Sequence, residues 1–173
     1  MTLHFNQSLP SILQKIGPYN HHHFTIHEHH TIREDHDKET LQKYHDAKWA
    51  IVDLLNTHQQ IPYIINLYNW LHHQPHDEVA YFLSEAGSNT LNYAEFKAPS
   101  HFEVWLGKKG IILGIAQQGT PFNPTHINSH NIKENEGAAF DFFRNCEGII
   151  FFDHPTTART VYYYNSNKKF PPH

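Results

Sequence analysis

Apolar residues along the chain change their spacing, and the changes separate helical segments from strands. In residues 37–57 and 77–93 they recur every three or four positions, which predicts two amphipathic helices. Shorter stretches with the same spacing predict helices at residues 10–16, 63–73 and 136–144.

Strand patterns begin after Pro99, where the apolar period becomes two. Residues 101–117 alternate on both sides of a GKKG turn and predict a hairpin, and residues 148–164 predict a second one. Residues 23–27 alternate weakly, as in an edge strand. Because tight turns join antiparallel strands, we expect an α/β two-layer sandwich, with helices packed on one face of a mixed, mostly antiparallel sheet.

Three segments are predicted from this order of elements: an N-terminal helical extension at 1–60, a main domain at 61–164 and a tail at 165–173. Apolar residues near the end of the extension, from Trp49 to Leu55, are expected to pack onto the main domain or onto a second subunit. Residues 120–135 contain two prolines and four asparagines and predict a polar loop.

Composition limits the classes of partner. The 173 residues carry 13 lysines and arginines against 17 aspartates and glutamates, a formal charge of −4, which disfavours binding to nucleic acid. No apolar run reaches the roughly 18 residues of a membrane span, and the N-terminus lacks a signal-peptide pattern. We therefore expect a cytoplasmic protein without nucleic-acid or membrane partners.

Histidine is unusually frequent, with 18 residues, nine of them between His4 and His45. His27 and His29 would share one face of a strand, and His72 and His73 are adjacent. A structural zinc site needs four converging ligands, which these pairs do not supply by themselves. A histidine-rich metal-binding protein therefore stays open as an alternative.

One face of the helix predicted at 77–93 carries oxygen-bearing side chains. Glu85, Asn89 and Asn92 are spaced four and three residues apart, so they lie on the same side of a helix. Carboxylate and carboxamide oxygens at this spacing suit a hard cation such as magnesium.

Segments around this face resemble the GHKL family of ATPases and kinases. LSEAGSNTLNY at 83–93 is similar to the family's N box, and IAQQGTPF at 115–122 is similar to its Asp-x-Gly box. NEGAAF at 135–140 resembles the second glycine box, and the closing hairpin, with Thr157 or Thr160, lies where the family keeps a Gly-Thr pair. The spacing resembles that of the anti-sigma-factor serine kinases most, over about residues 60–164.

The resemblance implies an ATP and magnesium site between the third helix and the sheet. Asn89 would ligate the magnesium ion, and Glu85 would act as the catalytic residue that orients the attacking water or hydroxyl. Residues 123–135 would form a lid over the phosphates. The other residues that would bind the nucleotide are Gln117, Gly119, Lys133, Gly137, Ala139 and Thr160.

Departures from the family's boxes put ATP binding in doubt. Gln117 stands where the family has the aspartate that accepts a hydrogen bond from adenine, and Ala139 stands where it has a glycine.

One interpretation is a degenerate, regulatory domain in which ATP binds weakly or not at all. Its partner would be a sigma-like or anti-anti-sigma-like protein, and the family implies a homodimer. The other is an active Mg·ATP-dependent serine/threonine kinase. Side chains such as Phe122 or Phe140 filling the pocket would favour the first.

Overall fold

The computed structural model describes residues 3–26, 34–58, 61, 64–68, 78–86, 100–117, 120–134 and 137–166. Within these ranges only the backbone is described at 34–37 and 85–86. Of the helix predicted at 63–73 the structure describes residues 64–68, and these do not form it: 64–66 have no regular structure and 67–68 form a 3₁₀ turn. The second half of the helix predicted at 77–93 lies outside the described residues.

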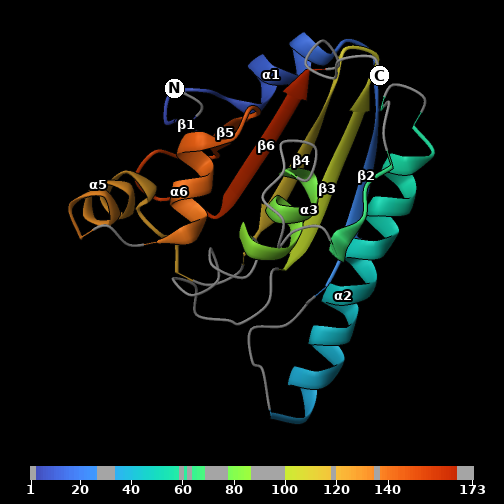
Figure 1. The fold of residues 1–173 in the computed structure, drawn as a ribbon, viewed down its shortest axis with the longest axis horizontal. Helices are drawn as coiled ribbons and strands as arrows, with labels where there is room; N and C mark the ends of the chain where they lie inside the picture. The colour runs from blue at the N-terminus through green and yellow to red at the C-terminus, as the bar shows by residue number, and fades with distance from the viewer. Residues whose placement is uncertain are drawn as a thin grey trace.

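A six-stranded sheet organises the described residues, in the order β1-β5-β6-β4-β3-β2 (Figure 1). Its strands are β1 (Leu3–His4), β2 (Tyr19–Thr25), β3 (His101–Gly107), β4 (Gly110–Ala116), β5 (Ile149–Phe152) and β6 (Thr160–Ser166). β1 pairs with β5 in parallel, whereas the other four pairings are antiparallel. The predicted fold class, an α/β two-layer sandwich on a mixed, mostly antiparallel sheet, is confirmed, and both predicted hairpins lie in that sheet.

Both edges of the sheet come from the first 25 residues. Leu3 of β1 pairs with Ile150, and β2 pairs with β3 along its whole length, from Tyr19 opposite Gly107 to Thr25 opposite His101. The segment at 1–60 therefore contributes strands to the sheet, whereas the sequence suggested a helical extension. β2 is an edge strand, as its weak alternation predicted.

The main helical layer covers one face of the sheet with α2 (Glu34–Asn56), α3 (Glu78–Tyr81) and α6 (Ala138–Asn145). Ile51 and Leu55 of α2 are fully buried in the core with Val104 of β3. The ring of Tyr44 stacks on Phe102 at 5.8 Å. The apolar stripe of α2 thus packs onto the sheet of its own chain, one of the two arrangements expected for it. Among the described residues, no helix combines the length and hydropathy that crossing a bilayer requires.

A second, smaller core lies on the opposite face of the sheet, under α1 (Leu9–Ile16). Ile12 and Ile16 pack there with Trp105 and Tyr162. Gly107 allows this approach, because a Cβ at that position would lie 2.5 Å from the carbonyl oxygen of Ile16. The helix predicted at 10–16 therefore exists, but it occupies the face that the predicted helical layer left uncovered.

Residues 120–135 do not form the predicted polar loop, because α5 (Pro124–Glu134) occupies most of that segment. Asn123 caps the helix: its Oδ1 accepts a hydrogen bond from the backbone N–H of His126 at 2.9 Å. Pro124 is the first residue of the helix, where a missing N–H costs nothing. The Asn123 cap and Pro124 therefore start a helix, although this polar segment has no apolar stripe that would have predicted one.

The helix predicted from residue 77 begins as α3 and continues as a π-helical turn, η3 (Phe82–Ala86). Val79, Phe82 and Leu83 are buried, as the predicted apolar stripe required. The hydroxyl of Tyr44 donates to the carbonyl oxygen of Leu83 at 3.1 Å. Because a π turn changes the hydrogen-bond register, such a side-chain donor can satisfy a carbonyl at this point.

Candidate functional site

The structure describes five of the eight predicted site residues in full. Glu85 lies in η3 with its backbone alone described, and Asn89 and Gly119 lie outside the described residues. The five that are described in full are Gln117, Lys133, Gly137, Ala139 and Thr160.

Gln117 directly follows β4 and is 5% exposed. Its backbone N–H donates to the carbonyl oxygen of Arg159 at 2.9 Å, and its Nε2 donates to the carbonyl oxygen of Thr120 at 3.3 Å. Its Oε1 is buried and has no hydrogen-bond partner among the described residues. A buried acceptor without a donor costs about 1–3 kcal/mol. A ligand carrying an amino group would satisfy it.

The N-terminus of α6 is closed on one side by Asn131 of α5. Gly137 caps this helix in the left-handed region, at φ 85°, without a side-chain cap. A Cβ on Gly137 would lie 2.8 Å from Cγ of Asn131 and closer still to its Nδ2. Asn131 is 3% exposed, and its Nδ2 has no hydrogen-bond partner in the described part of the chain. A phosphate approaching α6 from this side would have to displace that side chain.

Aromatic rings fill the space between the first turn of α6 and the sheet. Ala139 and Phe140 are both buried in the main core. Phe140 stacks on Phe152 of β5 at 6.1 Å, and Phe122 meets the same ring edge-on at 5.9 Å. The sequence placed the nucleotide space between the third helix and the sheet, and the second half of that helix lies outside the described residues.

Lys133 and Thr160 lie apart from this group. Lys133 lies in the last turn of α5 with its side chain 82% exposed, 3.8 Å from the carboxylate of Glu134. Thr160 alternates with Val161, so its side chain lies on the α1 face of the sheet, beside Tyr162, whereas α6 covers the other face. The structure therefore brings Gly137 and Asn131 together and places Thr160 across the sheet from them.

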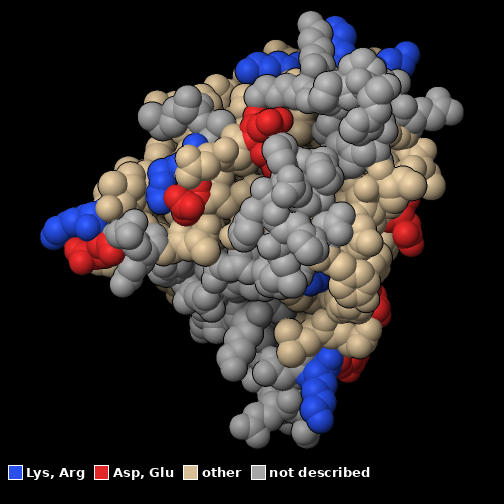
Figure 2. Space-filling view, in the orientation of Figure 1, with Lys and Arg blue, Asp and Glu red and all other residues tan. Residues whose placement is uncertain are grey.

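Charged side chains of both signs are interspersed on the face seen in Figure 2, several of them beside a partner of opposite charge. Among the described ion pairs, Arg144 lies 3.6 Å from Asp141. The described residues on this face therefore present no broad field of one sign.

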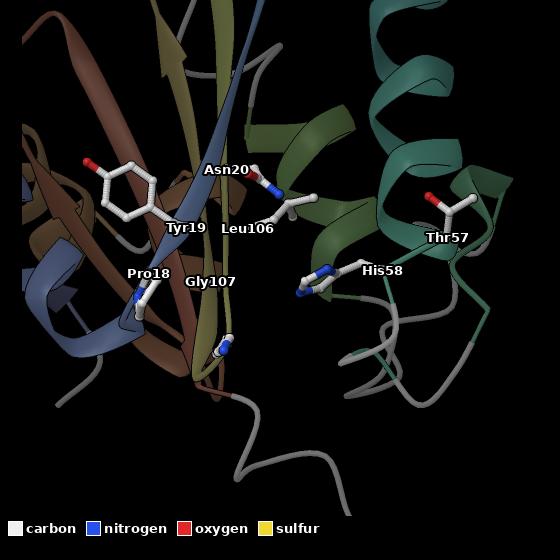
Figure 3. A pocket seen from close by; sticks show the side chains of 8 residues that line it. Pro18, Tyr19, Asn20, Thr57, His58, Leu106 and Gly107 are labelled. Atoms are coloured by element: carbon white, nitrogen blue, oxygen red, sulfur yellow. The ribbon is translucent and has the colours of Figure 1, made fainter.

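A pocket of about 510 Å³ opens at the other end of the β3–β4 hairpin (Figure 3). His58, just after α2, projects into it toward Asn20 and Leu106. The Nε2 of His58 is buried without a hydrogen-bond partner among the described residues. Gln117 follows the opposite end of β4, and none of the five fully described candidate residues lines this pocket.

A group of side chains that could hold a metal lies on β2 and β3, at other positions than the histidine pairs that the sequence suggested. His27, His29, His72 and His73 lie outside the described residues. Among the residues that the structure describes, His23, His101 and Glu103 bring three candidate ligand atoms within 4.8 Å of one another. The sequence signal was a polar residue at every second position in two segments, His21 and His23 in one and His101 and Glu103 in the other. Nothing in the sequence showed that these two segments pair.

No protein-family model matches the chain, and no curated protein matches it either.

Proposed function

We propose that the chain is a degenerate GHKL-type regulatory domain, which contacts a protein partner and has lost most of its affinity for Mg·ATP. The observation that carries the proposal is the filling of the space beneath α6 by Phe122 and Phe140. Both rings contact Phe152, so opening a cavity there would expose part of the main core.

The position of Asn131 supports the same proposal. A helix N-terminus binds phosphate through backbone N–H groups that point at the ligand. At α6 the residue before the helix is Gly137, and the side chain of Asn131 packs directly against it. Phosphate binding would therefore require α5 or its asparagine to move.

An active Mg·ATP-dependent serine/threonine kinase is the second candidate, favoured by Gln117. Its buried Oε1 lacks a partner among the described residues and could accept a hydrogen bond from the adenine amino group. An uncharged acceptor in place of the family's carboxylate would weaken binding by about 1–3 kcal/mol, or about 5- to 150-fold.

Isothermal titration of the full chain with Mg·ATP separates the two candidates. We expect no measurable binding up to about 1 mM ATP, a limit of about −4 kcal/mol. Gln117→Asp combined with Ala139→Gly and Asn131→Ala should strengthen binding to a measurable level, because it supplies the carboxylate and clears the helix N-terminus. The affinity should stay low, because Phe122 and Phe140 still fill the space beneath α6. Asn89→Ala in that background should then remove the dependence on magnesium.

Lys15→Ala in the same background is the matched control, since this side chain is exposed and lies on α1, across the sheet from α6. Micromolar binding by the unmodified chain, with phosphoryl transfer to a protein, would favour the kinase. No gain from the triple substitution would contradict the assignment of the nucleotide site to these residues.

The remaining parts of the proposal follow from the family resemblance. The partner would be a sigma-like or anti-anti-sigma-like protein in the cytoplasm, and the chain would form a homodimer. Analytical ultracentrifugation tests the last point, and a monomer at all concentrations would contradict it.

A further inference from the structure

Four polar residues with metal-binding side chains lie together on the sheet face opposite α2 and α6. His21 and His23 are on β2, and His101 and Glu103 are on β3. His23 pairs directly with Glu103 in the antiparallel register. On β3 these residues alternate with Phe102 and Val104 of the main core, which fixes them on the other face.

Glu103 is the centre of the cluster. One carboxylate oxygen, Oε1, lies 3.2 Å from Nε2 of His21 and 3.8 Å from Nδ1 of His23. The other oxygen, Oε2, lies 3.9 Å from Nε2 of His101. The two oxygens thus face imidazole nitrogens of three different histidines.

Ser100 can hold His101 in the tautomer that binds a metal. Its hydroxyl lies 3.2 Å from the carbonyl oxygen of Ala116, to which it can donate, and 2.9 Å from Nδ1 of His101. A serine hydroxyl has one hydrogen, so when that hydrogen is on the carbonyl the hydroxyl accepts from the Nδ1–H of His101. Metal binding at Nε2 requires this tautomer, in which Nε2 carries a lone pair on the side of Glu103.

Ring stacking holds the other two histidines. His23 stacks on His101 at 4.6 Å, and His21 lies parallel to Trp105 at 4.7 Å with an interplanar angle of 1°. His21 therefore keeps its Nε2 beside Glu103, where it can donate to the carboxylate and orient it.

We propose that His23, His101 and Glu103 bind a divalent transition-metal ion, with Zn²⁺ as the ion that fits best. Two imidazoles and a carboxylate form a ligand set that zinc accepts, with water at a fourth position. His21 and Ser100 are positioning residues, because each fixes a ligand through a hydrogen bond.

The distances are compatible with this assignment. The three candidate ligand atoms lie within 4.8 Å of one another, whereas bonds of about 2.0–2.2 Å in a tetrahedral site place ligand atoms about 3.3–3.5 Å apart. Each atom must therefore move by on the order of 1 Å. The side chains of His23 and His101 are 48% and 31% exposed, which leaves room for such rotation.

This site is independent of the proposed function. The residues beneath α6 that close the nucleotide site belong to the main core, whereas the histidine cluster lies on the opposite face of the sheet. Zinc binding can therefore be present whether or not the chain binds ATP.

The test is a competition for Zn²⁺ between the full chain, without an added histidine tag, and a chromophoric chelator. We expect one equivalent of Zn²⁺ to bind more tightly than any Zn²⁺ that the other histidines bind. His23→Gln and Glu103→Gln should each abolish that equivalent. Ser100→Ala should weaken it by about 10- to 100-fold, the range for a residue that orients a metal ligand.

The matched control is His126→Gln with His130→Gln, which removes a stacked pair one turn apart on α5. This variant should keep the tight equivalent. Circular dichroism and thermal melting without metal establish that each variant folds. Loss of the tight equivalent in the control, its retention in both cluster variants, or absence of any tight equivalent in the unmodified chain would each overturn the proposal.

Discussion

Tyr163 donates a buried hydrogen bond to Glu78, 85 positions away in the sequence, with 2.8 Å between Tyr163 Oη and Glu78 Oε2. The same carboxylate accepts hydrogen bonds from the backbone N–H groups of Glu147 and Gly148. Asn165 in turn donates to Tyr163 Oη at 2.8 Å. The first residue of α3 is thereby tied to the segment that leads into β5 and to the centre of β6.

Glu78→Gln should destabilise the fold, because the NH2 end of an amide cannot accept a hydrogen bond and leaves one donor unpaired, whereas both oxygens of a carboxyl group keep acceptor lone pairs even when it is protonated. Burial raises the pKa of Glu78 above its ordinary value, although the hydrogen bonds it accepts oppose this shift. The protonated form is then favoured on folding, so the stability contributed by Glu78 is full below about pH 4.5 and is lost as the pH rises through the raised pKa.

We therefore expect Glu78→Gln to lower the free energy of unfolding by about 1–3 kcal/mol at acid pH, and by less at neutral pH. Urea unfolding between pH 4 and pH 8 measures this difference, with the exposed Glu134→Gln as control. A difference that grows with pH would contradict the raised pKa.

Gly137→Ala should be strongly destabilising for two separable reasons. Its φ of 85° costs about 1–2 kcal/mol for a residue with a Cβ, and that Cβ would collide with Asn131. In an Asn131→Ala background the collision disappears and only the backbone cost remains. A thermal-unfolding cycle of the two single variants and the double variant measures the coupling.

Gly17→Ala serves as the comparison for this cycle, because Gly17 has φ 74° and a Cβ added there would meet nothing within 4 Å beyond its chain neighbours. Gly17→Ala should lower the free energy of unfolding by the same amount in the unmodified chain and in the Asn131→Ala variant. Simple additivity of Gly137→Ala and Asn131→Ala would show that Asn131 does not close the N-terminus of α6.

Tyr162 should make the fold sensitive to alkali. Burial, and then the nearby carboxylates of Asp153 and Glu103, raise the pKa of Tyr162 from 10.0 to about 12. Its stability contribution is full below pH 10 and is lost as the pH rises through 12, a total of about 2–3 kcal/mol. Tyr162→Phe should reduce the decline of stability in denaturant unfolding, and Tyr164, whose pKa burial also raises, should account for part of what remains. The exposed Tyr19→Phe should leave the decline unchanged.

Gly107→Ala should displace α1 from the sheet, since the new Cβ would lie 2.5 Å from the carbonyl oxygen of Ile16. Overpacking of this kind costs about 1–3 kcal/mol, and loss of the α1 contacts adds to it. Gly114→Ala is a milder comparison, with its nearest atoms at 3.1 Å in the ring of Tyr162. Limited proteolysis should cleave near α1 in the first variant before it does so in the second.

The hairpins could be predicted because each combines local alternation with a nearby turn. β2 was harder, since its consecutive histidines give neither face an apolar pattern, and its partner β3 begins 76 residues after β2 ends, from Thr25 to His101. α5 escaped prediction because its helical signal is the cap at Asn123 and Pro124, not an apolar stripe.

The candidate site residues also differ in whether a local sequence pattern marks them. Gln117 and Gly137 could be singled out because each belongs to a short local motif. Asn131 could not, since its importance comes from packing against Gly137 across the break between two helices. The histidine cluster also needed the strand register, which no local pattern in the sequence specifies.

The parallel pairing of β1 with β5 sets an order for folding. Leu3 and His4 are synthesised long before their partners, Ile150 and Phe151. While the ribosome makes the intervening chain, this edge of the sheet has no strand to pair with. Pairing over such a separation slows folding, because loop closure must come before the contacts that reward it. The antiparallel β3–β4 hairpin can form early, whereas the β1 edge can be completed only after β5 has left the ribosome.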